Sequence, residues 1–238
     1  SLIKNGAGTL TLAGATPYSG ATSIGAGKLA VTSSGSLSNS AVTLASGATL
    51  GLQVLAGYDA WRCKSLTLSG GSVTVALRFH RGSPSGTTAP VWVGGDFVNN
   101  GTLNVSLDGA SVTNGVYPLI RYTGSISGSG SLGTVALPAG GVGALVDNSA
   151  NQTIDLSVTT PVSPLVWNGG TGDWDIGATA NWSGLRSTYQ DGDLVLFDDT
   201  SLGGSPLAVT VAAAVNPNNV LFNNASKTYT LTGPGALS

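Results

Sequence analysis

Residues 8–12 read Gly8-Thr9-Leu10-Thr11-Leu12, and the same arrangement, a glycine followed by apolar residues at alternate positions, returns at Gly27-Lys28-Leu29-Ala30-Val31. Alternation with a period of two is typical of a β-strand with one buried face. The step from Leu10 to Leu29 is roughly 20 residues, within the range that marks repeat architectures. The chain is therefore predicted to be a β-repeat protein. Comparable strands are expected at 41–44, 47–52, 66–68, 73–75, 103–107, 154–156 and 209–211.

The composition favours an all-β fold and excludes several classes of partner. With no glutamate in the chain, all eleven acidic residues are aspartates, which favour turns over helix interiors. The 36 glycines and 8% charged residues would suit disorder, but a net charge of -2 and 41% hydrophobic residues argue against it. No cluster of lysines and arginines suits nucleic acid, and no apolar run is long enough to span a bilayer. We expect a folded β protein with no nucleic-acid partner and no membrane insertion by this segment.

The strands are expected to form a parallel β-helix, or β-solenoid, with roughly 20 residues per coil. In such a fold each strand pairs with its equivalents one coil above and below, so apolar side chains stack in columns inside while Thr, Ser and Asn face water. Loop excursions are expected near 58–64 and 78–90, which are richer in charge and aromatic rings than their surroundings. The two prolines at 161 and 164 divide the chain into a solenoid at 1–160 and a tryptophan-rich β unit at 161–238 that continues it.

The first thirty residues resemble a known family of repeats. The stretch Leu2-Ile3-Lys4-Asn5-Gly6-Ala7-Gly8-Thr9-Leu10, continued by residues 18–29, resembles the autotransporter-associated β-strand repeat, also called the passenger-associated transport repeat. Segments 94–103 and 117–156 look like those that trail such repeats, and 166–222 is similar to the tryptophan-rich unit that precedes them in very large surface proteins. The resemblance implies a right-handed β-helix, secretion to the extracellular cell surface, and a role as stalk or adhesin.

The leading interpretation is structural: an extracellular scaffold or adhesin segment that is not an enzyme and whose main partner is itself. The terminal stretch Gly233-Pro234-Gly235-Ala236-Leu237-Ser238 is of the kind that, in the resembled family, leads into a stretch like residues 2–10. The chain is therefore expected to be one period of a tandem array, or to stack end to end into a filament or stalk. Each end would then present an open β-coil.

Four tryptophans are the candidate ligand or assembly contacts: Trp61, Trp167, Trp174 and Trp182. The last three define the first alternative function, a carbohydrate-binding module for surface glycans, because flat aromatic rings stack on the C–H faces of sugars. The competing interpretation is that the same rings pack at the edge of the coil.

The second alternative is a polysaccharide-degrading β-helix enzyme, which needs clustered carboxylates. Aspartates do occur in pairs, at 173 and 175, 191 and 193, and 198 and 199, but turn capping explains them more simply, and the residue spacing of a calcium loop is absent. His80, the only histidine, is interpreted as a surface-loop residue, and Cys63, the only cysteine, as a small buried apolar residue. No catalytic residue, metal or cofactor is predicted.

Overall fold

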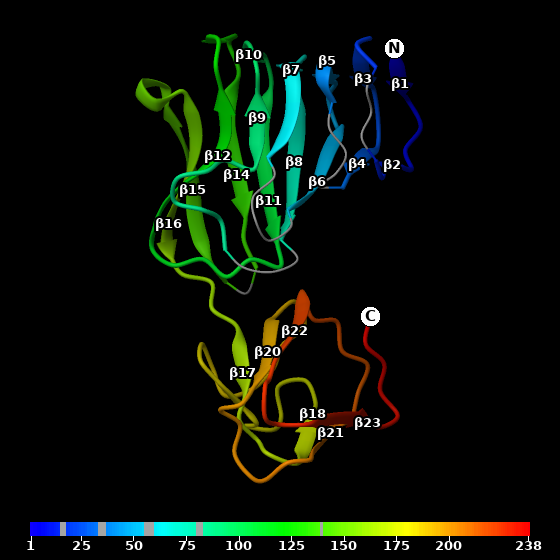
Figure 1. Cartoon of the computed structure of the whole chain (residues 1–238), viewed down its shortest axis with the longest axis vertical. Coiled ribbons are helices and arrows are strands. Elements are labelled where there is room, and N and C mark those ends of the chain that lie inside the picture. The colour runs from blue at the N-terminus through cyan, green and yellow to red at the C-terminus, as the bar shows by residue number, and fades with distance from the viewer. Residues whose placement is uncertain (15–17, 33–36, 55–59, 80–82, 139) are drawn as a thin grey trace. The chain divides into compact units, whose positions relative to one another are not determined.

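A computed structural model describes residues 1–238 except 15–17, 33–36, 55–59, 80–82 and 139 (Figure 1). The described residues form β-strands and one short 3₁₀ helix, η1 (Ser149–Asn151), so the predicted all-β class is confirmed. Within these residues, no helix has the length and apolar character needed to cross a membrane. The chain divides into two compact units, unit 1 with Ser1–Leu137 and Gly141–Pro161, and unit 2 with Val162–Ser238.

Unit 1 is built from two sheets that the chain visits in turn (Figure 1). The first sheet runs in the order β1-β3-β5-β7-β9-β12-β16-β15, with β10 beside β7 and β13 beside β10. Its strands are β1 (Leu2–Lys4), β3 (Thr22–Ile24), β5 (Leu37–Leu44), β7 (Trp61–Leu68), β9 (Val91–Val93), β10 (Phe97–Asn99), β12 (Gly115–Tyr122), β13 (Ile126–Ser127), β15 (Val142–Asn148) and β16 (Thr153–Thr160).

The second sheet of unit 1 is parallel throughout and runs in the order β14-β11-β8-β6-β4-β2. Because successive strands alternate between the two sheets up to β8 and each pairs with the strand one coil away, the arrangement is consistent with the predicted β-solenoid. The strands of this sheet are β2 (Thr9–Leu12), β4 (Lys28–Val31), β6 (Thr49–Val54), β8 (Ser72–Phe79), β11 (Thr102–Asp108) and β14 (Ser131–Ala136).

Apolar side chains from successive coils stack in columns between the sheets. Leu29, Leu50, Val75 and Val105 occupy equivalent positions on β4, β6, β8 and β11, and each is at most 2% exposed. A leucine or valine moved fully out of water contributes about 1.5–3 kcal/mol to folding. The predicted dry interior is therefore present and supplies much of the stability of unit 1.

Within unit 1 the coil lengthens along the chain, so the predicted length of roughly 20 residues applies there only to the first coils. Hydrogen bonds between neighbouring coils span 20 residues from Gly20 to Ser40, 25 from Leu44 to Ser69, and 30 from Asn104 to Thr134. The regular glycine-leucine stretches that suggested the shorter period lie in the early coils, whereas the later coils contain longer connections between the strands.

Glycine is required at one corner of the early coils. Gly27 has a φ of 69°, and a Cβ there would lie within 2.6 Å of the carbonyl oxygens of Gly6, Ala7 and Gly8. The corner of the second coil therefore stacks directly on the corner of the first, and any larger residue would separate the two.

The predicted loop excursions are partly wrong. Trp61 and Cys63 belong to β7 and pair with Val91 and Val93 of β9. Their side chains are buried, whereas that of Arg62 between them is exposed, as expected for alternate positions of a strand. Residues 78 and 79 likewise end β8. Only the described residues 60 and 83–90 of the two predicted excursions lie outside strands.

The parallel prediction fails at the end of unit 1, where the first sheet closes with antiparallel strands. β16 pairs antiparallel with both β12 and β15, and η1 connects β15 to β16. Ile154 and Leu156 were expected to continue the parallel columns. A short hairpin connection can only reverse the chain direction, so these strands form an antiparallel cap instead.

Unit 2 repeats the two-sheet arrangement in sheets of its own, ordered β19-β17-β20-β22 and β18-β21-β23. All of its strand pairs are parallel except β17 with β19. The strands are β17 (Leu165–Trp167), β18 (Gly172–Trp174), β19 (Trp182–Ser183), β20 (Leu194–Asp198), β21 (Leu207–Val211), β22 (Asn219–Asn223) and β23 (Tyr229–Thr232).

Candidate ligand-binding surface

The four predicted contact tryptophans are core residues. Trp167, Trp174 and Trp182 are 0%, 0% and 3% exposed in unit 2, and Trp61 is 4% exposed in unit 1. Their ring centroids lie 5.0 Å apart for Trp167 and Trp182 and 5.3 Å apart for Trp174 and Trp182, with edge-to-face geometry. Since other side chains cover these rings, no ring face is left for a sugar, and the tryptophans stabilise the fold.

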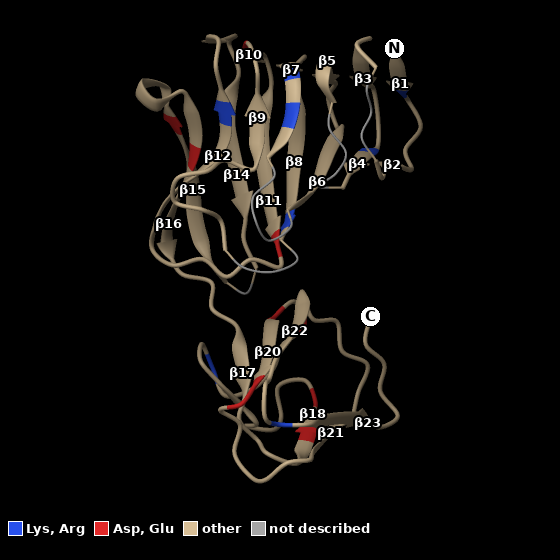
Figure 2. Cartoon of the chain, viewed as in Figure 1, with Lys and Arg blue, Asp and Glu red and all other residues tan. Residues whose placement is uncertain are grey.

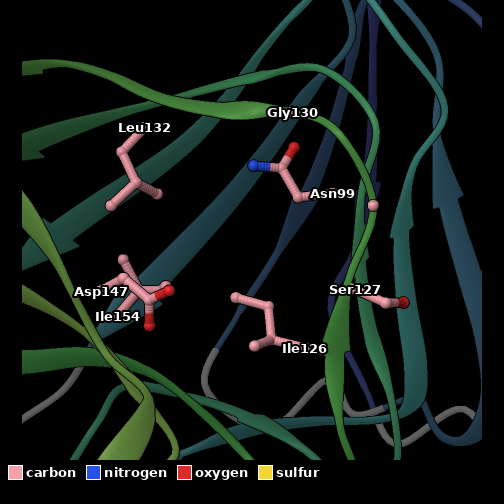
Figure 3. A pocket seen from close by; sticks show the side chains of 8 residues that line it. Asn99, Ile126, Ser127, Gly130, Leu132, Asp147 and Ile154 are labelled. Carbon is pink, nitrogen blue, oxygen red and sulfur yellow. The ribbon is translucent and has the colours of Figure 1, made fainter.

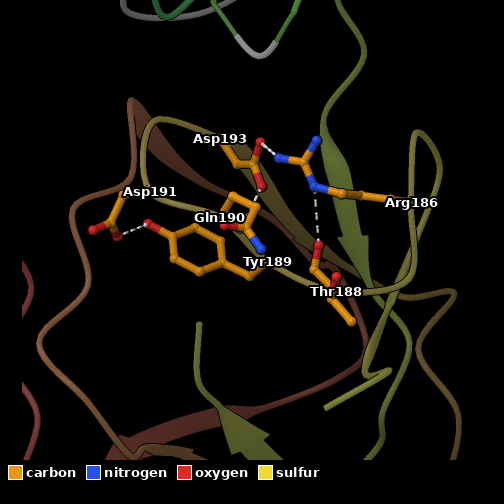
Figure 4. Close-up of polar contacts among 6 residues, drawn as sticks. All are labelled: Arg186, Thr188, Tyr189, Gln190, Asp191 and Asp193. Carbon is orange, nitrogen blue, oxygen red and sulfur yellow. Dashed lines mark hydrogen bonds and ion pairs between the residues drawn. The ribbon is translucent and has the colours of Figure 1, made fainter. Parts of the chain in front are cut away.

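A polar loop, residues 186–193, contacts this aromatic core through Tyr189, and Figure 4 shows the polar contacts within the loop. Arg186 forms an ion pair with the buried Asp193, and its Nε donates to the carbonyl oxygen of Thr188 at 3.1 Å. The second carboxylate oxygen of Asp193 accepts from the Gln190 backbone amide at 2.8 Å. The buried charge is thus paired and hydrogen-bonded, which is the condition under which a buried carboxylate is tolerated.

Tyr189 anchors the same loop to the core. Its ring packs edge-to-face on Trp174 at 5.4 Å, and its hydroxyl donates to Asp191 Oδ1 at 3.1 Å. Burial, followed by the hydrogen bond to Asp191, raises the pKa of the Tyr189 hydroxyl well above its usual range. Ring packing and hydrogen bonds therefore both hold the loop in place.

The paired aspartates of unit 2 act as hydrogen-bond acceptors for loops. Asp199 accepts from the backbone amides of Ala225, Ser226 and Lys227 at 2.9, 3.0 and 2.9 Å, and these bonds, that of Ala225 first, lower its pKa to about 2. Asp191 similarly accepts from the Asn216 amide at 2.8 Å. Turn capping therefore describes these carboxylates, and the described residues contain no group of three or more His, Cys, Asp or Glu placed to hold a metal ion.

A row of two exposed arginines and one half-buried tryptophan crosses the outer face of the first sheet of unit 1. Trp92 on β9 is in register with Arg62 on β7 and Arg121 on β12. The guanidinium carbons lie 4.9 Å from the Trp92 ring centroid for Arg62 and 5.1 Å for Arg121. Figure 2 shows basic residues on β7 and β12 and acidic residues on the β15–β16 hairpin. This row was not predicted, because its members are about 30 residues apart in sequence and meet only through strand pairing.

A pocket of about 470 Å³ lies at the Arg121 end of this row. Arg121, Asn148, Asn151, Thr153 and Asp155 form its polar side. Such a volume is within the range of roughly 300–1,000 Å³ that small-ligand sites occupy. The remaining lining residues are Gly86, Thr87, Val116 and Pro118.

A second, smaller pocket of about 190 Å³ lies between the last coil and the antiparallel cap (Figure 3). Ile126, Leu132 and Ile154 line it together with Asp147 and the amide of Asn99. The Asn99 amide is already used, because its Nδ2 donates to the Ser131 carbonyl at 3.2 Å and its Oδ1 accepts from the Gly101 amide at 3.1 Å. The amide is thus part of the fold and is not free to select a ligand.

Cys63 is 1% exposed, as predicted for a small apolar residue, and burial raises the pKa of its thiol to about 12. His80 lies outside the described residues.

We expect the Cys63 thiol to be inert in the folded protein. A thiol with a pKa of about 12 has almost no thiolate at pH 8, and the thiolate is the reactive form. Treatment with a disulfide reagent such as DTNB at pH 8 should therefore release less than about a tenth of the expected chromophore within an hour, and the full amount in guanidinium chloride. Rapid stoichiometric labelling of the native protein would contradict the burial of β7.

Comparisons with known proteins agree with the sequence resemblance. The passenger-associated-transport-repeat family matches residues 2–31, which span β1 to β4. The chain is also similar to the adhesin BmaC autotransporter of Brucella suis biovar 1 (strain 1330), with 29% identity over 266 residues. That alignment covers 93% of this chain and 8% of the Brucella protein, so the chain spans a small part of the relative's length. No solved structure matches the chain significantly.

Proposed function

We propose, from the premise that this chain is a secreted, cell-surface segment of an autotransporter-type passenger repeat protein, that it serves as a non-enzymatic scaffold of an adhesin-type stalk. In this role its end coils pair with further β-coils, either of tandem copies or of stacked molecules. The observation that carries the proposal is that the apolar columns of each unit end in half-exposed side chains, on strand edges that no other described strand pairs with.

The first coil of unit 1 provides one such end. Leu10 and Leu12 on β2 are only half-buried, whereas their neighbours Leu29 and Val31 on β4 are 0% and 2% exposed. β1 and β2 are the edge strands of their sheets, so one side of each backbone has no strand partner among the described residues. A further coil would bury the two leucines and complete both ladders.

The last coil of unit 2 provides the other end. Phe222 on β22 stacks on the fully buried Phe197 of β20 with ring centroids 4.8 Å apart and planes 12° apart, yet it is itself 46% exposed. β22 and β23 are the edge strands of the two sheets of unit 2, so one side of each backbone has no strand partner among the described residues. The outer face of the Phe222 ring therefore offers a position for the next residue of the same column.

The right-handed winding belongs to the same proposal. Consecutive parallel strands in this chain are joined by connections through a second sheet, and connections between parallel strands are right-handed in about 98% of known cases because strands twist to the right. The parallel strand pairs of both units meet the condition of this rule.

A non-enzymatic role is supported by how the carboxylates are used. Asp191, Asp193 and Asp199 accept hydrogen bonds from backbone amides, and Asp193 also pairs with Arg186. These carboxylates therefore stabilise loops of the fold. A glycoside hydrolase needs two carboxyl groups facing one another across the substrate. The tryptophan-based glycan module lacks support for the reason already given, because its three rings are buried.

Phe222→Glu is expected to abolish end-to-end association. The native chain should form rods or higher oligomers with increasing concentration, seen by analytical ultracentrifugation and negative-stain electron microscopy. A glutamate on β22 would place a charge in the contact between coils and prevent pairing. Leu185→Glu, at a position 49% exposed in a loop of unit 2, is the matched control and should associate like the native chain.

Circular dichroism must show that both variants remain folded. A native chain that stays monomeric at millimolar concentration, or a Phe222→Glu variant that associates as the native chain does, would overturn the stacking proposal.

A further inference from the structure

Asp155 lines the pocket beside Arg121, and one of its carboxylate oxygens is buried and lacks a hydrogen-bond donor. Asp155 is 4% exposed, and its Oδ2 accepts from Asn148 Nδ2 at 2.7 Å. None of the described residues donates a hydrogen bond to Asp155 Oδ1. Leaving a buried acceptor without a donor is unfavourable, and more so for a charged group. A ligand hydroxyl or amine in the pocket would satisfy this acceptor once the carboxylate turns Oδ1 toward it.

Arg121 supplies a positive charge at the same pocket. No described carboxylate forms an ion pair with it, and its guanidinium lies over the Trp92 ring. The Trp92 ring limits the conformations of the Arg121 side chain and holds it at the pocket. A guanidinium held in this way is suited to a planar anion such as a carboxylate.

The two charges together restrict the class of ligand. An amine would satisfy Asp155 Oδ1 but would be repelled by Arg121, and a simple anion would pair with Arg121 but would be repelled by Asp155. A ligand that carries both a carboxylate and hydroxyl groups satisfies both residues. Val116, which is 56% exposed, and Pro118 line the same pocket on β12, and this apolar part suits the C–H face of a sugar ring.

We propose that this pocket binds an acidic sugar unit, with its carboxylate on Arg121, a hydroxyl donating to Asp155 Oδ1, and its ring against Val116 and Pro118. The side chains of Asn148, Asn151 and Thr153 add polar groups for further hydroxyls. The site is independent of the stacking proposal, since none of its residues belongs to the end strands β1, β2, β22 or β23.

The test is a nuclear magnetic resonance titration of the ¹⁵N-labelled full chain with three probes: D-glucuronate, D-glucose and acetate. D-Glucuronate should shift the amide signals of Arg121, Asn151 and Thr153 in a saturable manner. D-Glucose lacks the carboxylate and acetate lacks the hydroxyls, so each should bind at least about tenfold more weakly, since a hydrogen bond to a charged group is worth about 1.5–3 kcal/mol.

Two matched variants locate the binding. Arg121→Gln should weaken D-glucuronate binding by about tenfold or more, whereas Arg62→Gln, which removes the arginine on the other side of Trp92 outside the pocket, should leave it unchanged. Asp155→Asn should also weaken binding. If this substitution at a buried position prevents folding, Arg121→Gln at an exposed position still tests the proposal. No saturable shift with D-glucuronate, equal binding of acetate or D-glucose, or unchanged binding to Arg121→Gln would each overturn the proposal.

Discussion

Leu66→Asp is expected to unfold unit 1 at 25 °C. Leu66 is fully buried on β7 and stands in register between Val42 on β5 and Phe97 on β10. The substitution removes a buried leucine side chain, which alone costs about 2–5 kcal/mol, and adds a carboxylate with no partner in an apolar column. The sum is comparable with the total stability of an ordinary domain, about 5–15 kcal/mol. Circular dichroism and urea denaturation would measure the loss.

Lys64→Asp is the control for this substitution. Lys64 lies on the same strand but is exposed, so an aspartate there should change the free energy of unfolding by less than about 1 kcal/mol. A folded Leu66→Asp protein of near-native stability would mean that water reaches the columns, and the solenoid interpretation would then fail.

Trp174→Ala should destabilise unit 2 by about 3–5 kcal/mol, the usual cost of truncating a buried large aromatic residue. Trp174 is 0% exposed, and its ring lies 5.4 Å from that of Tyr189 and 5.6 Å from that of Phe197. The cavity left by the indole would also remove the support for the polar loop anchored by Tyr189. Near-ultraviolet circular dichroism followed during urea denaturation should show the transition at a lower urea concentration.

Trp174→Phe separates packing from the indole N–H group. Trp174 Nε1 is buried and has no hydrogen-bond partner among the described residues, so replacing the indole removes an unsatisfied donor while keeping an aromatic ring. We expect a smaller loss, about 1–2 kcal/mol. Equal stability of Trp174→Ala and the native chain would show that the tryptophan cluster is not the core of unit 2, and would reopen the sugar-stacking alternative.

The candidate site illustrates which residues escaped prediction and why. The alternation in Ile154-Asp155-Leu156 predicts one more strand, and it correctly places the aspartate opposite to its apolar neighbours. An aspartate on the outer face of a strand is ordinarily solvated, so nothing in this local pattern predicts that Asp155 is buried. Its burial follows from the antiparallel cap, which places β16 between β12 and β15.

The sequence by itself determined the strands of the early coils and which of their side chains face inward. A strand's side chains alternate with a period of two, so the columns through Leu29 and Leu50 and the first coils could be predicted from neighbouring residues alone. Only the tertiary structure decided which outward residues meet, because that depends on the number of residues in each coil, and this number changes along the chain. The contact of Trp92 with Arg62 and Arg121, the antiparallel cap and the enclosure of the tryptophans all depend on this pairing between distant strands.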